Sequence, residues 1–192
     1  PKQELFNYSK FLKRKNNFVM LGRVGNDKKT FEAIKFFSNF KKKNLNLKLG
    51  KLLIVGPIKK KFQTKVEYFR KRYINDVKFY GQIDYIKRNK ILISNKYGLH
   101  LSEEEHFGRS LLEMQKKGML VFAHNSGGAK EIIFNFNQKF STYQNLEKKI
   151  KKLVNSKYLQ RTFLINNQKI FSKNFTDLEF NNNLKKNLKK WK

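Results

Sequence analysis

The sequence predicts an α/β fold, on three observations. Short runs of apolar residues are solid and do not alternate with polar ones, which is typical of strands buried on both faces. These runs alternate with segments of about 10 or more residues whose apolar side chains recur at helical spacing. The first three of these runs end at a glycine. We therefore expect a single Rossmann-like domain, in which a parallel sheet of about six strands carries helices on both faces.

The expected elements follow one another in a regular order. The strands are expected at residues 18–22 (FVMLG), 52–56 (LLIVG), 77–81 (VKFYG), 97–102 (YGLHLS), 119–123 (MLVFA) and 139–142 (KFST). Helices are expected at 30–40, 62–73, 90–94, 108–117, 144–154, 158–171 and 177–191. Asp84 is expected to cap the segment that follows it, and the glycine pair 127–128 is expected to open a further helix.

The domain is expected to comprise residues 1–176. Residues 177–192 are expected to form a C-terminal helix that packs on an N-terminal domain absent from this sequence. The first residue is Pro1 and not Met, so we expect the chain to be a piece of a longer protein.

The composition excludes several classes of protein. The chain has 192 residues, of which 39% are hydrophobic, enough for one domain with a core. It has no cysteine, which excludes disulfides and thiolate metal sites. Its three histidines form no pair at helical spacing, so no metal is expected. No apolar run reaches the ~18 residues of a membrane-spanning helix. We expect a cytoplasmic protein.

The net charge of +30 leaves two readings open. Such a charge attracts nucleic acid or an anionic membrane surface. The basic residues are mostly Lys, however, and they are spread along the whole chain among many Asn, Ile and Phe. Codon bias in an AT-rich genome produces this pattern without any binding function, and we favour that reading.

One edge of the predicted sheet gathers residues suited to ligand binding. Ligands of open parallel sheets bind outside the carboxyl ends of the strands. These ends carry the pairs 22–23 (GR), 56–57 (GP) and 81–82 (GQ), and the segments 102–106 and 124–128. A helix that begins near Gly108 offers free backbone N–H groups to a phosphate. Glu105 and Glu113, eight residues apart, can accept from sugar hydroxyls. The edge therefore predicts a ligand that carries both phosphate and sugar.

These residues resemble a known family. The motif EEHFGRSLLE, with Glu105 and Glu113, resembles the Glu-x7-Glu motif of family-four retaining glycosyltransferases, in the C-terminal, donor-binding domain of their GT-B fold. LGRVGNDKK, LLIVG, VKFYGQI and SGGAKEII appear in the family's order, and the resemblance spans roughly residues 17–180. GLH, EHFG and AHNSGG look most like the α-1,2-mannosyltransferases of dolichol-linked oligosaccharide assembly, and like some bacterial members.

The resemblance implies catalytic roles for three residues. Arg23 and Lys28 would hold the donor diphosphate, with Lys29 as a competing second cation; otherwise they are ordinary surface cations. Glu105 would contact the transferred sugar, or else be a carboxylate that answers the helix dipole. Glu103 and Glu104 are expected in a solvated loop.

The resemblance also implies a donor-binding set. Glu113 would accept from the ribose hydroxyls, the alternative being a solvent-facing helix glutamate. Phe107, Gly108 and Arg109 would offer backbone N–H groups, and Gly22 flanks the diphosphate cation. The base would be recognised near Gly81 and Gln82. His106 would touch the donor or be a hydrogen-bonded neighbour, and His100 and His124 are expected to be structural.

The reaction implied is hexosyl transfer from a nucleotide-sugar, GDP-mannose or a UDP-sugar, to an acceptor hydroxyl with retention. No cofactor or metal is implied, because the cations stabilise the leaving diphosphate. The implied partners are an acceptor glycan, lipid-linked or other, an N-terminal Rossmann-like domain and an anionic membrane surface to which the protein attaches peripherally. We expect little activity from this chain alone. The alternative is a non-enzymatic basic domain that binds nucleic acid or an anionic membrane; nucleic acid is disfavoured because no RNA-binding signature or helix-turn-helix stands out.

Overall fold

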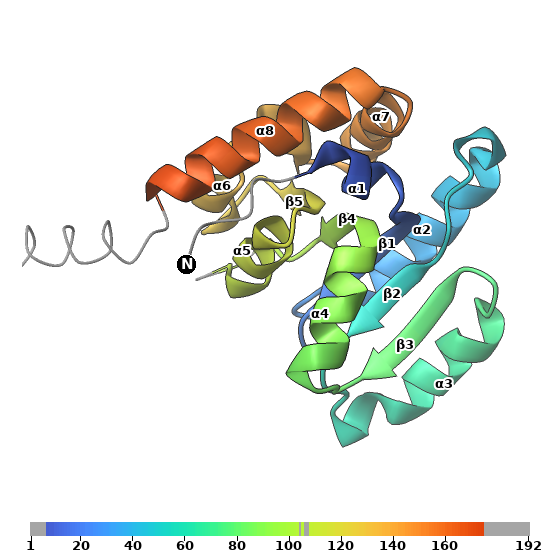
Figure 1. Ribbon diagram of the computed structural model, residues 1–192. Helices are drawn as coiled ribbons and strands as arrows, with labels where there is room; N and C mark the ends of the chain where they lie inside the picture. The colour runs from blue at the N-terminus through green and yellow to red at the C-terminus, as the bar shows by residue number, and fades with distance from the viewer. Residues whose placement is uncertain (1–6, 104, 106–107, 175–192) are drawn as a thin grey trace, which may run out of the picture.

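A six-stranded, fully parallel sheet forms the centre of the molecule, in the order β3-β2-β1-β4-β5-β6 (Figure 1). The computed structural model describes residues 7–103, 105 and 108–174, and only the backbone of 171–174. The strands are β1 Lys15–Leu21, β2 Leu52–Val55, β3 Val77–Gly81, β4 Asn95–His100, β5 Leu120–His124 and β6 Lys139–Phe140. The predicted α/β fold is confirmed.

The connections between the strands are helical. The α-helices are α1 Tyr8–Leu12, α2 Thr30–Lys43, α3 Gln63–Arg72, α4 Tyr85–Ser94, α5 Arg109–Lys116, α6 Ala129–Ile132, α7 Tyr143–Val154 and α8 Lys157–Asn174. Short 3-10 turns lie at Leu45–Leu47, Lys60–Phe62 and Phe136–Gln138. Asp84 caps α4 by accepting from the backbone N–H of Lys87 at 2.8 Å, as predicted.

The strands are solidly apolar because both faces of the sheet are covered. Along β1, Phe18 and Met20 join a core shared with α1, α2, α3, α7 and α8, whereas Val19 joins a second core shared with α4, α5 and α6. Gly98 in β4 allows α5 to pack closely, since a Cβ there would lie 2.9 Å from Met114 Sδ. Side chains therefore alternate between two buried layers instead of between core and water.

Two details differ from the expected elements. β1 and β4 begin earlier than the apolar pattern indicates, because Lys15 pairs with Asn95 through the backbone, which needs no apolar side chain. Helix α1 was not expected; its Phe11 is fully buried. The segment 90–94 is helical as predicted, within α4. The expected helix at 177–191 and the proposed boundary at 176 lie outside the described residues.

The order of the strands reverses between β1 and β4, which lie side by side. In open α/β sheets, such a switch point creates a crevice at the carboxyl ends of the strands, because the loops on either side leave in opposite directions. The loops after β1 and β4 flank this position. Among the described helices, none is both long and apolar enough to cross a membrane.

Candidate functional site

The loops after β1 and β4 touch at the switch point. The hydroxyl of Ser102 donates to the backbone carbonyl of Asp27 at 3.1 Å. The β1 loop is held in turn by Gly25 and Thr30, since the N–H of Gly25 donates to Thr30 Oγ1 at 3.2 Å. Lys29 adopts a left-handed backbone conformation (φ 49°) at the start of α2. The adjacent Lys28 and Lys29 thereby reach the β4 loop.

Glu105 is the centre of the site. Its Oε2 lies 2.7 Å from Lys28 Nζ and 3.0 Å from His100 Nε2, and its Oε1 accepts from the backbone N–H of Gly108 at 3.0 Å. The side chains of Lys28 and Glu105 are 22% and 12% exposed. The carboxylate therefore joins a cation of the β1 loop to the N-terminal end of α5.

The three hydrogen-bond donors favour the ionised form of Glu105. The hydrogen bond from His100, together with those from Lys28 and Gly108, outweighs burial and holds the pKa of this carboxyl well below its usual range. Because a carboxylate only accepts, His100 Nε2 carries the hydrogen in this contact. Glu105 is thus ionised at neutral pH, in a position where a positive helix end adds to the stabilisation.

Two glycines bring the backbone close to Glu105. Gly108, which precedes α5, has φ 55°, and a Cβ there would lie 2.1 Å from the Cδ1 of Ile132. Gly127 has φ 51°, and a Cβ there would lie 2.7 Å from the carbonyl oxygen of Glu105. The N–H of Gly128 donates to the same carbonyl at 2.6 Å. The glycine turn after β5 therefore packs directly on the Glu105 loop.

Glu103 lies in an exposed loop, as expected, but its side chain has partners there. Its carboxylate pairs with Lys29, and His124 Nε2 lies 3.8 Å from it. Its carbonyl accepts from the hydroxyl of Ser126. Glu103 is still half exposed. Lys28 and Lys29, the two competing cations, are therefore each paired with a different glutamate of the β4 loop. Glu104 lies outside the described residues.

Arg23 lies apart from this network. It pairs with Asp27 at 3.4 Å within its own loop, and both side chains are more than half exposed. Gly22, which precedes it, donates its N–H to the carbonyl of Val55 at 2.9 Å and so joins the loop to β2. Arg23 is thus free to turn toward a ligand at little cost, since an exposed pair of this kind is worth about 0–1 kcal/mol.

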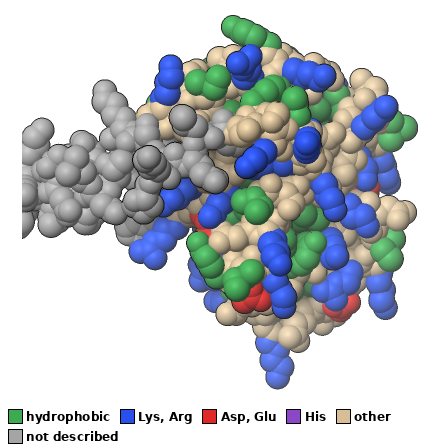
Figure 2. All heavy atoms as spheres, viewed as in Figure 1, with side chains coloured by type: hydrophobic (Ala, Val, Ile, Leu, Met, Phe, Trp, Pro, Cys, Tyr) green, Lys and Arg blue, Asp and Glu red, His purple; other side chains and the backbone are tan. Residues whose placement is uncertain are grey.

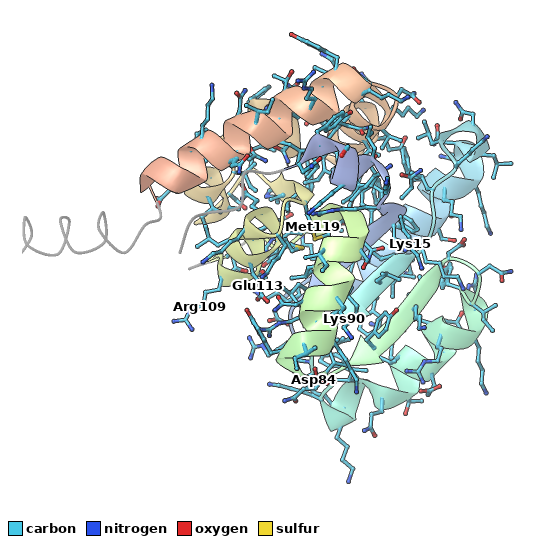
Figure 3. The ribbon with its side chains drawn as sticks, in the orientation of Figure 1. Lys15, Asp84, Lys90, Arg109, Glu113 and Met119 are labelled. Carbon is cyan, nitrogen blue, oxygen red and sulfur yellow. The ribbon has the colours of Figure 1, made fainter. Side chains whose placement is uncertain are left out.

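Glu113 is not the solvent-facing glutamate of the alternative reading. It is half-buried on α5, and its Oε1 lies 2.8 Å from Nε of Arg88 on α4. Figure 3 shows Glu113 between α5 and α4, while Arg109 extends outward from the start of α5. The structure thus brings Lys28, Glu105 and Gly108 together and gives Glu113 a separate partner.

The remaining predicted residues lie at the edge of the site or outside the described residues. Gly81 has φ 67° and its carbonyl accepts from the N–H of Gly56 at 2.9 Å, and Gln82 is exposed at the end of β3. His106 and Phe107 lie outside the described residues. In the part of the chain that is described, no three His, Asp or Glu side chains form a cluster suited to a metal ion. The prediction that no metal is needed stays a prediction.

Sequence reasoning missed two partners of the predicted glutamates. His100 was expected to be structural, but it contacts Glu105 directly; its place as the last residue of β4, five before Glu105, was the available signal. Arg88 carries no such signal, because its meeting with Glu113 depends on how α4 and α5 pack.

Comparison with known proteins gives one family. Residues 1–174 match the family described as Glycosyl transferases group 1. A GDP-Man:Man(3)GlcNAc(2)-PP-Dol alpha-1,2-mannosyltransferase of Xenopus tropicalis is 33% identical over 93 residues, which are 47% of this chain and 19% of that protein. The match to a mannosyltransferase is therefore partial.

Solved structures share the fold. HepE of Anabaena, crystallised in complex with UDP, superposes with a TM-score of 0.77 at 20% identity, covering 96% of this chain and 54% of HepE. The C-terminal domain of the group 1 glycosyl transferase LpcC of Francisella tularensis superposes with a TM-score of 0.71 at 18% identity, covering 84% of this chain and 86% of that domain. The present chain thus spans about half of HepE and has the fold of a GT-B C-terminal domain.

Proposed function

The chain belongs to the group 1 glycosyltransferase family, and from this premise we propose that it binds the nucleotide-sugar donor of a hexosyltransferase that acts with retention of configuration. The observation that carries the proposal is the contact of Lys28, Glu105 and the start of α5 at the switch point. This arrangement puts a cation, a carboxylate and a helix N-terminus beside one another, as a ligand with both phosphate and sugar requires.

The groups at the site keep capacity for a ligand. A carboxylate can accept about four hydrogen bonds, and Glu105 receives three from described residues, so one position remains for a sugar hydroxyl. The Lys28 ammonium directs one of its N–H groups at Glu105, which leaves the others for diphosphate oxygens. We propose that the Lys28–Glu105 pair holds both groups in position and stays intact when the donor binds.

Glu113 supplies the second carboxylate of the proposal. Its Oε1 forms an ion pair with Arg88 Nε that lacks hydrogen-bond geometry, and its Oε2 has no partner among the described residues. We propose that Oε2 accepts from the ribose hydroxyls of the donor, while Arg88 fixes the side chain. Gly81 and Gln82, at the end of β3, are proposed to lie near the base.

The proposed chemistry is electrostatic. As the bond between the sugar and the diphosphate breaks, the leaving nucleoside diphosphate gains negative charge. Arg23, Lys28 and the N-terminal end of α5 would stabilise that charge, with the backbone N–H of Arg109 and contributions proposed for His106 and Phe107. The N–H of Gly108 donates to Glu105 and so would position that carboxylate instead. Glu105 would hold the sugar through a hydroxyl group. No step in this scheme requires a metal.

The similar proteins point to two different bases for the donor, guanine and uracil. The curated relative is named for GDP-Man, and HepE was crystallised with UDP. Because these proteins match this chain only in part or at low identity, they support a nucleotide-sugar and do not choose between GDP-mannose and a UDP-sugar. The acceptor glycan, the N-terminal domain and the membrane surface remain predictions, as does the cytoplasmic location.

A thermal-shift titration tests the proposal. The full chain is titrated with GDP-mannose, UDP-glucose and an ADP-sugar at about 0.3 M salt, which screens non-specific attraction to a chain of net charge +30. We expect one base to raise the melting temperature above the others. Glu113→Ala should greatly reduce that shift, whereas Glu147→Ala on α7, outside the site, should not.

Two outcomes would contradict the proposal. If all three nucleotides shift the melting temperature equally and the shifts vanish with salt, the chain binds anions through its general charge. If the shift is specific but survives Glu113→Ala, the donor binds without Glu113 and the proposed role of that residue fails.

A further inference from the structure

A cavity of about 580 Å³ lies on the side of the sheet that carries α4. Its lining residues are Lys15, Asn17, Lys51, Leu53, Lys78, Tyr80, Lys90, Ile91, Ser94 and Asn95. They come from β1, β2 and the residue before it, β3, α4 and the start of β4. The cavity therefore opens beside α4, over the amino-terminal parts of β1 and β2.

The cavity wall carries four lysines and no acidic residue. The lysines come from four separate segments of the chain, so the fold gathers them and a local run does not. Figure 2 shows the surrounding face, on which lysine and arginine side chains dominate and acidic ones are few. Cations that converge on one concave surface focus a positive potential there.

The side chains of two of the four lysines have no hydrogen-bond or ion-pair partner among the described residues. Lys51 Nζ donates to the carbonyl of Ile74 at 3.0 Å, and Lys78 Nζ lies 4.9 Å from the centre of the Tyr80 ring. The side-chain ammonium groups of Lys15 and Lys90, by contrast, make no hydrogen bond or ion pair with any residue that the structure describes. Figure 3 shows them on neighbouring parts of the same face, Lys15 at the start of β1 and Lys90 on α4.

The asparagine side chains between the lysines already make hydrogen bonds within the protein. Asn17 Nδ2 donates to Asn95 Oδ1 at 2.8 Å, and Asn17 Oδ1 accepts from the N–H of Lys51 at 2.7 Å. These bonds tie the starts of β1, β2 and β4 together and make the floor rigid. The lysine ammonium groups are therefore the groups that remain to attract an anionic ligand.

We propose that this cavity binds an anion that carries more than one phosphate charge. Lysine is a common point-charge ligand for phosphate. The volume lies within the range of about 300–1,000 Å³ usual for small-molecule sites, which is more than a single inorganic phosphate fills. The site is distinct from the donor edge, because Lys15 begins β1 whereas Arg23 and Lys28 follow its end.

The same phosphate chemistry is offered by two sources, a free polyphosphate and the headgroup of an anionic lipid. Ile86 and Ile93 are 66% and 49% exposed on α4 and lie on the same helical face as Lys90. Exposed isoleucines beside a cationic cavity are what a lipid headgroup site would use to contact the bilayer. They provide a separate arm of the test.

Calorimetric titration with inorganic pyrophosphate tests the proposal on the full chain. All proteins carry Arg23→Gln, which weakens competition from the donor edge, and are measured at about 0.15 M salt. Lys15→Gln/Lys90→Gln should weaken pyrophosphate binding about tenfold or more. The matched control is Lys35→Gln/Lys151→Gln, which removes the same charge from exposed positions on α2 and α7; it should change the affinity less than threefold, about 0.7 kcal/mol.

Equal weakening by the two pairs of substitutions would overturn the proposal, because it would show general attraction and no site. If the Lys15/Lys90 pair changes the melting temperature of the protein, Lys90→Gln alone, at an exposed position on α4, replaces it and should still weaken binding severalfold. No detectable pyrophosphate binding to the parent protein would also overturn the proposal.

Vesicles then identify the source of the phosphate. Sedimentation is measured with phosphatidylcholine vesicles that contain phosphatidic acid. For a lipid headgroup, Ile86→Ser/Ile93→Ser should reduce vesicle binding and leave pyrophosphate binding unchanged. For a free polyphosphate, the Lys15/Lys90 variant and its control should sediment alike while differing in pyrophosphate affinity.

Discussion

Lys28 Nζ lies 2.7 Å from Glu105 Oε2, so two residues that the family resemblance assigns to adjacent parts of one donor, the diphosphate and the transferred sugar, contact each other. The contact joins the β1 loop to the β4 loop across the switch point of the sheet. It makes Lys28 part of the structure of the site as well as a candidate ligand for phosphate. Lys29, the competing cation, pairs with Glu103 instead.

Methionine substitutions separate the roles of these two lysines. Lys28→Met removes one of three donors from the largely buried Glu105 and should cost about 1–3 kcal/mol of unfolding free energy. Lys29→Met breaks a more exposed pair and should cost about 0–1 kcal/mol. Urea unfolding of both variants checks the difference. If Lys28 also holds the diphosphate, only Lys28→Met should reduce the thermal shift caused by the donor; a loss confined to Lys29→Met would assign the diphosphate to Lys29.

The stability of the protein should depend on Glu105 in acid. The pKa of this carboxyl is lowered from its ordinary value of 4.5, so the folded state binds its proton less readily than the unfolded state. Its contribution to stability is therefore complete above pH 4.5 and is lost as the pH falls from there toward the folded value. The advantage of the wild type over Glu105→Gln should be about 2–3 kcal/mol at pH 7 and should shrink as the pH falls below 4.5.

Other carboxyls also lose their stabilising effect in acid, and a control removes their contribution. Asp76 and Glu103, whose pKa values are lowered too, are present in both proteins, so the difference between the two isolates Glu105. Glu147→Gln on α7 should follow the wild type at every pH. A constant gap between wild type and Glu105→Gln from pH 7 to pH 3 would contradict the assignment of the shift.

The sequence was sufficient to predict the sheet and the residues that lie at the carboxyl ends of its strands. Solid apolar strands followed by glycine, alternating with amphipathic helices, leave few arrangements other than a parallel sheet, and the carboxyl ends of parallel strands share one edge. Gly22 and Glu105 follow strands at that edge, and Gly81 ends one, as expected. Helix α1 was not predicted because only one of its five side chains, Phe11, is buried, and a single buried residue forms no helical periodicity.

The contacts within the site could not be predicted in the same way. Lys28 and Glu105 are 77 positions apart, and their meeting depends on the path of two loops that the left-handed Lys29 and the Ser102–Asp27 hydrogen bond determine. The pair of Arg88 and Glu113 depends on the packing of α4 against α5. Periodicity records which side of a helix is buried, but not which polar side chains meet across it.

A single methyl group should show how tightly the β5 loop packs on the site. Gly127 and Gly81 both have positive φ, 51° and 67°, so alanine is strained at either position, by about 1–2 kcal/mol. A Cβ at Gly81 meets nothing within 4 Å, whereas one at Gly127 lies 2.7 Å from the carbonyl oxygen of Glu105. Gly127→Ala should therefore cost about 1–3 kcal/mol more than Gly81→Ala. Chemical denaturation of both variants checks this, and equal costs would mean that the Glu105 loop moves away freely.

A double-mutant cycle tests whether Arg88 acts on the donor through Glu113. Arg88 Nε lies 2.8 Å from Glu113 Oε1, and both side chains are about one-third exposed. If Arg88 orients the carboxylate, Arg88→Ala should weaken donor binding about threefold to tenfold, since misplacing one hydrogen-bonded group costs about 1 kcal/mol. In a Glu113→Ala background the same substitution should have no further effect.

Lys87→Ala is the matched control for this cycle. Lys87 is the neighbour of Arg88 on α4 and pairs with Asp84 at 3.4 Å, away from Glu113, so its removal changes the net charge equally but leaves the carboxylate in place. Donor affinity should stay within twofold of the parent. Additive effects of Arg88→Ala and Glu113→Ala would show that Arg88 contacts the donor itself, because two groups that act independently contribute separately to the binding free energy.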